Sequence, residues 1–442
     1  MDTISDGILD SNTNNQLVKN DKKVIRGWAF YDWANSAFNL VITTAVFPQF
    51  FVAMAPAVFL IFGGELSRDA VYSFSISIAY FIIVGLLPML SGIADYSGRR
   101  KYFLKIFTYL GAISCMVLFF FDGPDRAYMA LVAYIAGTVG FGSSLVFYNS
   151  YLPDIATDDR HDKVSAQGYA YGYVGSVLLL VTILAMIQFH EQLGFASEEM
   201  PIRLGFLLVG IWWIVFANVS FRRLPDDKKT KMSRSLVFKG FKEVRKVGRK
   251  IWLDSKKVRF LSSYFFYIAG VNIVILLASL FAKVELNFES SELILLILLL
   301  QFLAAIGAFL FAYVSDKLGN RTALLIQLII WVGICIAAFF VQDKGMFYFI
   351  AVFVGLVFGG IQSLSRSTYS KMIDDPDIPL TSYFSFYQVI TFLAIVTGTA
   401  LFGIVSQITG NLRYPVLATG VFFILGLVLL MTVKLEFSKK VK

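Results

Sequence analysis

Apolar runs of about 20 residues recur along almost the whole chain, and this recurrence limits the fold more than any other feature. A run of that length crosses the hydrocarbon core of a bilayer as a helix, whereas a soluble core explains only isolated examples. Charged residues make up 16% of the 442 positions, against about a quarter in soluble domains. The sequence therefore predicts an integral membrane protein.

The runs between charged residues predict twelve membrane-spanning helices and an all-α membrane fold. Their expected ranges are 28–53, 70–92, 102–121, 127–150, 163–189, 203–221, 258–282, 292–314, 322–341, 346–370, 382–407 and 413–433. The first 26 residues are polar and lack the short apolar core of a signal peptide, so we expect a tail there.

Lysine and arginine fall mainly in one of the two sets of loops, which includes both termini and the long middle segment. The opposite set holds only six: Arg68, Arg126, Arg203, Lys283, Lys344 and Arg413. Because cytoplasmic loops are enriched in these residues, we expect both termini to be cytoplasmic. The net charge of +9 then reflects membrane orientation, and we expect no nucleic-acid partner.

A shift in composition at residues 222–257 predicts a basic cytoplasmic linker between two six-helix bundles, 28–221 and 258–434. Polar cytoplasmic tails are expected at 1–27 and 435–442. Within the linker, residues 237–251 have the spacing of a basic amphipathic helix. We expect it to contact anionic lipids of the inner leaflet, and a calmodulin-type or nucleic-acid target is the alternative.

The two halves share a short loop motif. GIADYSGRRK contains Gly92, Asp95, Gly98, Arg99 and Arg100, and YVSDKLGNR contains Asp316 and Arg321. Glycines allow a tight turn, the carboxylate can cap a helix, and the cations can bind helix carbonyls or lipid phosphate. An ordinary basic loop is the alternative. The pattern resembles the signature of the major facilitator superfamily, which implies a gating role in the outward-open state.

The first span carries a polar face. Asp32, Ser36, Asn39 and Thr43 recur at helical spacing, with Asn35 beside them. In hydrocarbon such a face must meet protein or water. It therefore predicts either the lining of a cavity or a seam of hydrogen bonds between helices.

Asp32 is the only carboxylate well inside a predicted span, and Arg366 lies at comparable depth in the tenth span. Intramembrane charges usually mark function. We therefore hypothesise that the two form a cytoplasmic-side gate or bind the two ends of a zwitterion. Two independent charges that reach the membrane surface are the alternative.

Further polar side chains within predicted spans are candidates for a substrate cavity, although packing roles explain each of them equally well. They are Tyr148, Asn149, Tyr267, Asn272, Gln362, Tyr387 and Gln388. Gly168, Gly172 and Gly175 instead predict close helix packing.

No G-x-x-x-x-G-K-[ST] motif occurs, and His161 and His190 form no recognisable metal motif. We therefore expect no cofactor, no metal and no enzymatic activity. Asp32 is the one candidate proton carrier, so proton coupling and uncoupled transport both stay open.

FYDWANSAF at 30–38, FYNSYLPDIA at 147–156, VSAQGYAYGYVGSVLLL at 164–180 and GGIQSLSRS at 359–367 resemble the vacuolar amino-acid effluxer (autophagy-related) family and its bacterial relatives. This resemblance implies the major facilitator fold, two pseudo-symmetric six-helix bundles, and efflux of amino acids or similar small polar solutes by alternating access. It implies a cell (inner) membrane location, or the vacuolar membrane if the source is fungal. A non-transporting scaffold, sensor or lipid-handling protein is the alternative.

Overall fold

The computed structural model describes residues 19–61, 63–227, 236–373, 378–410 and 413–435. Most of the two predicted tails and part of the predicted linker lie outside them. Within the described residues, eleven helices are long and apolar enough to cross a bilayer. Two further segments, Lys22–Ala45 and Phe47–Met54, meet at an angle of 43° and pass the same test together, so they are the candidate first span. The predicted all-α membrane fold is confirmed.

The N-terminal half contains α1 (Lys22–Ala37), the π-helical η1 (Phe38–Ala45), α2 (Phe47–Met54), α3 (Arg68–Ser97), α4 (Arg100–Leu118), η2 (Pro124–Arg126), α5 (Ala127–Asn149), α6 (Leu152–Ile155), η3 (Asp158–Arg160), α7 (His161–Gln188) and α8 (Glu199–Arg223). After it come α9 (Leu236–Leu253), α10 (Ser255–Glu285), α11 (Ser290–Leu318), α12 (Asn320–Phe339), α13 (Lys344–Lys371), α14 (Leu380–Thr409) and α15 (Arg413–Met431).

An antiparallel hairpin of β1 (Val58–Ile61) and β2 (Gly64–Ser67) follows the first span, with Val58 opposite Ser67. The hydropathy pattern shows only a connection between the first two predicted spans, so it does not predict this hairpin. We call its end of the molecule the hairpin side. The opposite end, where α9 lies, is called the α9 side.

The bend in the first span has a local cause. Pro48 occupies the first turn of α2, where its missing N–H requires no partner and its ring prevents continuation of the preceding helix. Before it, the Val46 N–H donates to the carbonyl of Val41, which is the i→i−5 pattern of a π-helix. The first span therefore changes direction beyond its polar face.

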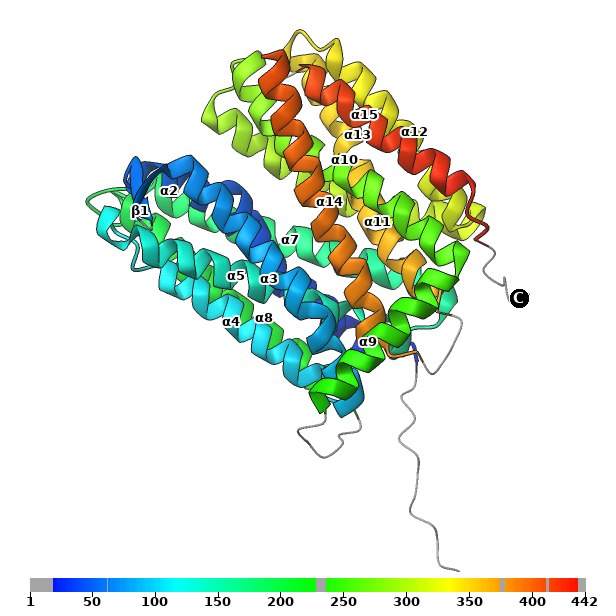
Figure 1. The fold of residues 1–442 in the computed structure, drawn as a ribbon. Coiled ribbons are helices and arrows are strands. Elements are labelled where there is room, and N and C mark those ends of the chain that lie inside the picture. Colours follow the sequence, from blue (N-terminus) through cyan, green and yellow to red (C-terminus); the bar gives the residue numbers. More distant parts are fainter. Residues whose placement is uncertain (1–18, 62, 228–235, 374–377, 411–412, 436–442) are drawn as a thin grey trace, which may run out of the picture.

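The long helices form two bundles, visible in Figure 1 as a blue-to-green half and a green-to-red half. One bundle contains α1, α3, α4, α5, α7 and α8, and the other contains α10 to α15. They meet where α7 packs against α11 and α13, and where α14 packs against α3 and α5. Large apolar side chains such as Phe81, Val132 and Phe302 are exposed on the outside, as contact with lipid chains requires.

The linker helix α9 touches both bundles at the α9 side, beside the ends of α3 and α14 (Figure 1). Its Gly240 lies against Gly92 and Ile93 of α3, so closely that a Cβ on Gly240 would be 2.8 Å from the Ile93 nitrogen. Further along, a Cβ on Gly248 would be 2.8 Å from the ring of Phe386 in α14. One face of α9 is thus packed against protein.

The opposite face of α9 is exposed and carries cations together with the large apolar side chains of Phe241 and Trp252. Contact of this face with anionic lipid stays a prediction.

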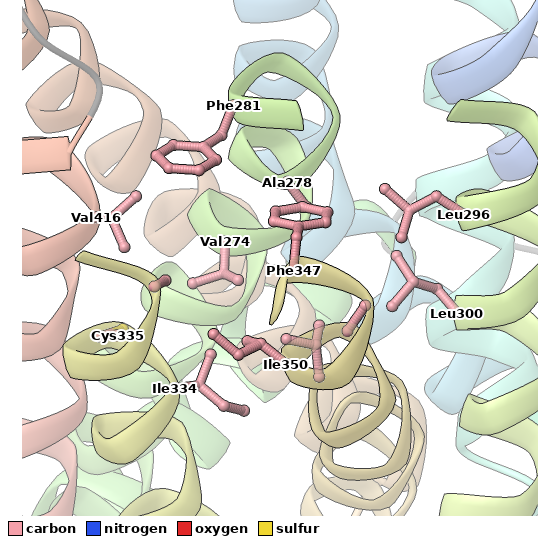
Figure 2. A pocket seen from close by; sticks show the side chains of 13 residues that line it. Val274, Ala278, Phe281, Leu296, Leu300, Ile334, Cys335, Phe347, Ile350 and Val416 are labelled. Atoms are coloured by element: carbon pink, nitrogen blue, oxygen red, sulfur yellow. The ribbon is translucent and has the colours of Figure 1, made fainter. Parts of the chain in front are cut away.

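Figure 2 shows a small apolar cavity inside the C-terminal bundle, with a volume of about 40 Å³. Phe281 of α10, Leu300 of α11, Cys335 of α12 and Phe347 of α13 are among the side chains that surround it. Among the described residues, only Cys335 brings a hydrogen-bonding side chain to this cavity, so it is a poor site for a polar solute.

Candidate functional site

Asp32 and Arg366 form an ion pair between the two bundles. Nη1 of Arg366 in α13 lies 3.2 Å from Oδ2 of Asp32 in α1, and both side chains are almost fully buried. Asp32 lies on the polar face of α1, and Arg366 lies near the end of α13, five residues before Lys371. The two candidate charges that were predicted from matching depth are therefore in direct contact.

The Arg366 guanidinium has further partners in the N-terminal bundle. It donates from Nε to Oγ of Ser165 at 2.9 Å, from Nη2 to the Ser165 carbonyl at 2.8 Å, and from Nη1 to Oδ1 of Asn149 at 3.2 Å. The rings of Trp28 and Tyr169 lie 4.7 and 4.2 Å from its central carbon. Such stacking and charge-assisted hydrogen bonds hold the guanidinium in one orientation.

Asp32 is held by a second side chain. The hydroxyl of Tyr148 in α5 donates to Oδ2 of Asp32 at 2.7 Å. Tyr148 is fixed in turn, because its ring stacks on Trp28 with a centroid distance of 4.5 Å and its carbonyl accepts from Nε1 of Trp28 at 3.0 Å. Of the predicted site residues, Asp32, Tyr148, Asn149 and Arg366 thus form one network.

A second contact between the bundles centres on Asp162, in the first turn of α7. Its carboxylate is 2.6 Å from Nζ of Lys371 and accepts from Oγ of Ser315 at 2.7 Å and from Nδ2 of Asn320 at 2.8 Å. The Asp162 side chain is only 1% exposed, so this charge depends on its partners in α11, α12 and α13.

A third contact involves the loop motif of the N-terminal half. The Asp95 carboxylate accepts the backbone N–H groups of Thr381 and Ser382, at 3.0 and 2.6 Å. These groups belong to the first turn of α14, where a carboxylate also interacts favourably with the helix dipole. One bundle therefore caps a helix of the other.

The other residues of this motif contact α9 and the N-terminal bundle. Gly98 ends α3 in the left-handed conformation, with φ of 59°, which a glycine adopts at little cost. Gly92 is the close contact with α9. Arg100 pairs with Asp154 and Asp227 at 2.8 and 2.9 Å, and the Arg99 side chain is half-buried beside it.

The second copy of the motif is arranged differently. Asp316 is exposed, and its neighbour Ser315 makes the contact with Asp162. Arg321 donates to the carbonyls of Leu430 and Met431, at the end of α15 in its own bundle. The two copies therefore do not make equivalent contacts.

Two predicted residues of the first span lie towards the hairpin side of the Asp32–Arg366 pair. Asn35 is buried, and among the described residues its Nδ2 has no hydrogen-bond partner. Asn39 is exposed, although it lies two turns beyond Asp32 on the same predicted face. The polar face of the first span thus continues beyond the ion pair.

The remaining predicted residues lie in the C-terminal bundle. The Tyr267 hydroxyl lies 2.7 Å from Oγ of Ser365, which precedes Arg366, and the Tyr387 ring stacks on Tyr264 with centroids 4.4 Å apart. Asn272 donates to the Ile268 carbonyl of its own helix. Gln362 is half-buried and Gln388 is buried. None of these side chains is bonded to Asp32.

Several members of these networks were not predicted from the sequence. Asp162, Lys371 and Asn320 lie at predicted span ends, where charged and polar residues usually contact water. The sequence around Ser165 gave no indication of a contact, because a serine near the start of a helix is common. Trp28 and Tyr169 could have been found as aromatic residues at the depth of Arg366. In the described part of the chain, no three His, Cys, Asp or Glu side chains gather as metal ligands.

The chain is similar to known transporters over most of its length. It is 29% identical to the MFS-type transporter YxiO of Bacillus subtilis, over 96% of this chain and 98% of that protein. It is 25% identical to autophagy-related protein 22-1 of Aspergillus niger, over 86% of this chain and 75% of that protein.

Among solved structures, FucP of the major facilitator superfamily in its outward conformation matches with a TM-score of 0.68 and 15% identity, over 94% of this chain and 99% of FucP. That protein is the fucose:proton symporter of E. coli. This match shows the fold.

The model of the family described as vacuole effluxer Atg22 like matches residues 20–442. Together with the two-bundle fold, this match places the chain in that family of major facilitator superfamily transporters, as a multi-pass membrane protein.

Proposed function

We propose that this transporter moves a small zwitterionic solute, such as an amino acid, by alternating access. The buried Asp32–Arg366 pair carries the proposal, because it joins the two bundles through one anion and one cation. The predicted bundles 28–221 and 258–434 then move as units on either side of it.

A zwitterion is chemically suited to this pair. Its carboxylate can accept the hydrogen bonds of the Arg366 guanidinium, while its ammonium group can replace the guanidinium beside Asp32. A buried charge without a partner strongly destabilises the protein. The bundles can therefore separate at this point only if Asp32 and Arg366 each gain another partner of opposite charge. A solute with both charges supplies that compensation, and a neutral sugar does not.

Polar groups beyond the ion pair support a route towards the hairpin side. Asn39 is exposed on the polar face of the first span, and among the described residues the Asn35 amide nitrogen lacks a hydrogen-bond partner. The hydroxyl of Tyr173 in α7 likewise has no partner in the described part of the chain. These groups can bind a polar solute before it reaches Asp32 and Arg366.

The contacts of Asp32, Asp95 and Asp162 all lie near the α9 side, so we assign the arrangement to a state closed at that side. The distribution of lysine and arginine favours a cytoplasmic location for the α9 side and for both termini. The family description as an effluxer favours export. Asp32 is the proposed proton carrier.

Purified protein in liposomes tests the proposal. We expect accelerated exchange of at least one amino acid, with at least tenfold loss in Asp32→Asn and Arg366→Gln, while Lys242→Gln on the exposed face of α9 keeps full activity. If the protein transported a neutral sugar and neither substitution changed that flux, the proposal of a zwitterionic solute would be contradicted. Specific binding without flux would instead support a non-transporting protein.

A further inference from the structure

A basic cavity lies at the α9 side, between the starts of α1 and α7. Its volume is about 540 Å³, and its wall includes Lys22 and Arg26 of α1, Arg160 of η3, and Lys163 of α7. Among the residues that the structure describes, no aspartate or glutamate lines it. Four cations around one cavity without a carboxylate in its wall indicate an anionic ligand.

The cavity is built by contacts that join the segment before α1 to the loop before α7. The Asn20 N–H donates to the Ile155 carbonyl at 2.8 Å, and Nδ2 of Asn20 donates to Oγ1 of Thr157 at 2.9 Å. The start of α1 is therefore fixed against the loop before α7.

The cavity faces away from the contact between the bundles. On α7, the lining residues Lys163, Gln167 and Tyr171 recur every four residues, which places them on one face of the helix. Asp162, which contacts the other bundle, lies on a different face. A ligand in this cavity is therefore separate from the proposed solute route.

The same face of α7 becomes apolar towards the membrane interior. Beyond Tyr171 it continues through Val174, Leu178 and Val181, which are 45%, 50% and 45% exposed. Inside the cavity, the buried side chains of Ile25 and Val164 give an apolar floor. A phosphate-bearing headgroup in the cavity would thus have exposed apolar side chains of α7 within reach of its acyl chains.

From this combination of charge, cavity and apolar stripe, we propose that the α1–α7 cavity is a binding site for an anionic phospholipid. Its phosphate contacts Arg26 and Lys163, and an acyl chain lies along Val174, Leu178 and Val181. Neither a free phosphate nor a soluble anion uses the second of these features.

Native mass spectrometry of the purified full-length protein tests this site, with phosphatidylglycerol and phosphatidylcholine of equal chain length as probes. We expect phosphatidylglycerol to be retained and to raise the melting temperature, and phosphatidylcholine to do neither. Arg26→Gln/Lys163→Gln is expected to reduce retention at least tenfold. The control Arg222→Gln/Lys317→Gln removes two exposed cations of α8 and α11, outside both α9 and the cavity wall, and should leave retention unchanged.

Equal retention by the wild type and the cavity variant would overturn the proposal. If Arg26→Gln/Lys163→Gln does not fold, Lys22→Gln/Arg160→Gln alters two exposed positions of the same wall and is read in the same way. Glycerophosphoglycerol and inorganic phosphate are the soluble probes. If either raises the melting temperature as much as phosphatidylglycerol at equal concentration, the ligand is a soluble anion and not a lipid.

Discussion

Gly168 of α7 lies so close to Asp32 of α1 that a Cβ on the glycine would be 2.5 Å from Oδ2 of the aspartate. The same Cβ would be 2.9 Å from Nη2 of Arg366. The ion pair therefore depends on a position without a side chain in the helix that packs against it. Gly168 was predicted as a packing position, and the structure places it directly beside the charged pair.

We expect Gly168→Ala to separate Asp32 from Arg366 and to reduce transport. Overpacking of this kind costs about 1–3 kcal/mol, so the melting temperature should fall as well. Gly85→Ala is the matched control, because nothing lies within 4 Å of a Cβ at that position. Measurement of amino-acid flux and thermal unfolding for both variants checks this expectation. Unchanged flux in Gly168→Ala would show that the contact has no functional importance.

The two members of the ion pair should show strong energetic coupling. Asp32→Asn and Arg366→Gln each leave one buried charge without its partner, at a cost of about 3–5 kcal/mol. The double variant removes both charges, so its loss of stability should be smaller than the sum of the single losses. Unfolding measurements on all three variants give the coupling. Strict additivity would argue against a direct interaction.

The cap that Asp95 gives to α14 should be visible in hydrogen exchange. In Asp95→Ala the N–H groups of Thr381 and Ser382 lose their acceptor, which is worth about 1–2 kcal/mol for a carboxylate at a helix N-terminus. We expect roughly tenfold faster exchange at these two amides. Asp316→Ala removes the exposed carboxylate of the second motif and serves as the control. Similar exchange in both variants would exclude the cap as a stabilising contact.

The contact between α9 and α3 makes a separate prediction. A leucine at Gly240 cannot be accommodated against Gly92 and Ile93, so Gly240→Leu should displace α9 from α3. Lys242→Leu introduces the same side chain at an exposed position two residues away. Faster hydrogen exchange at Val244 and Val247 in the first variant alone would support the contact. Equal protection in both variants would refute it.

Hydropathy was sufficient to predict the membrane fold, because each span must be apolar over about 20 residues whatever its neighbours are. It also gave the depth of Asp32 and Arg366, which is why their pairing could be hypothesised. The angular position of each helix was not predictable. Asp162, for example, has the sequence context of a solvated loop, and its partner Lys371 is 209 positions away.

The second loop motif shows another limit of sequence comparison. Asp95 and Asp316 occupy matching positions in the two halves, yet only Asp95 contacts the first turn of a helix in the other bundle. Ser315 and Asn320 contact Asp162 instead. Similar sequence motifs in the two halves therefore indicate a common origin of the segments, but they do not predict that the two copies make the same contacts.

In the three contacts centred on Asp32, Asp95 and Asp162, the carboxylate belongs to the first half of the chain and accepts at least one hydrogen bond from the second half. Two copies of the first half would lack Arg366, Lys371 and Asn320, and two copies of the second would lack the three carboxylates. The two halves therefore cannot substitute for each other at these contacts.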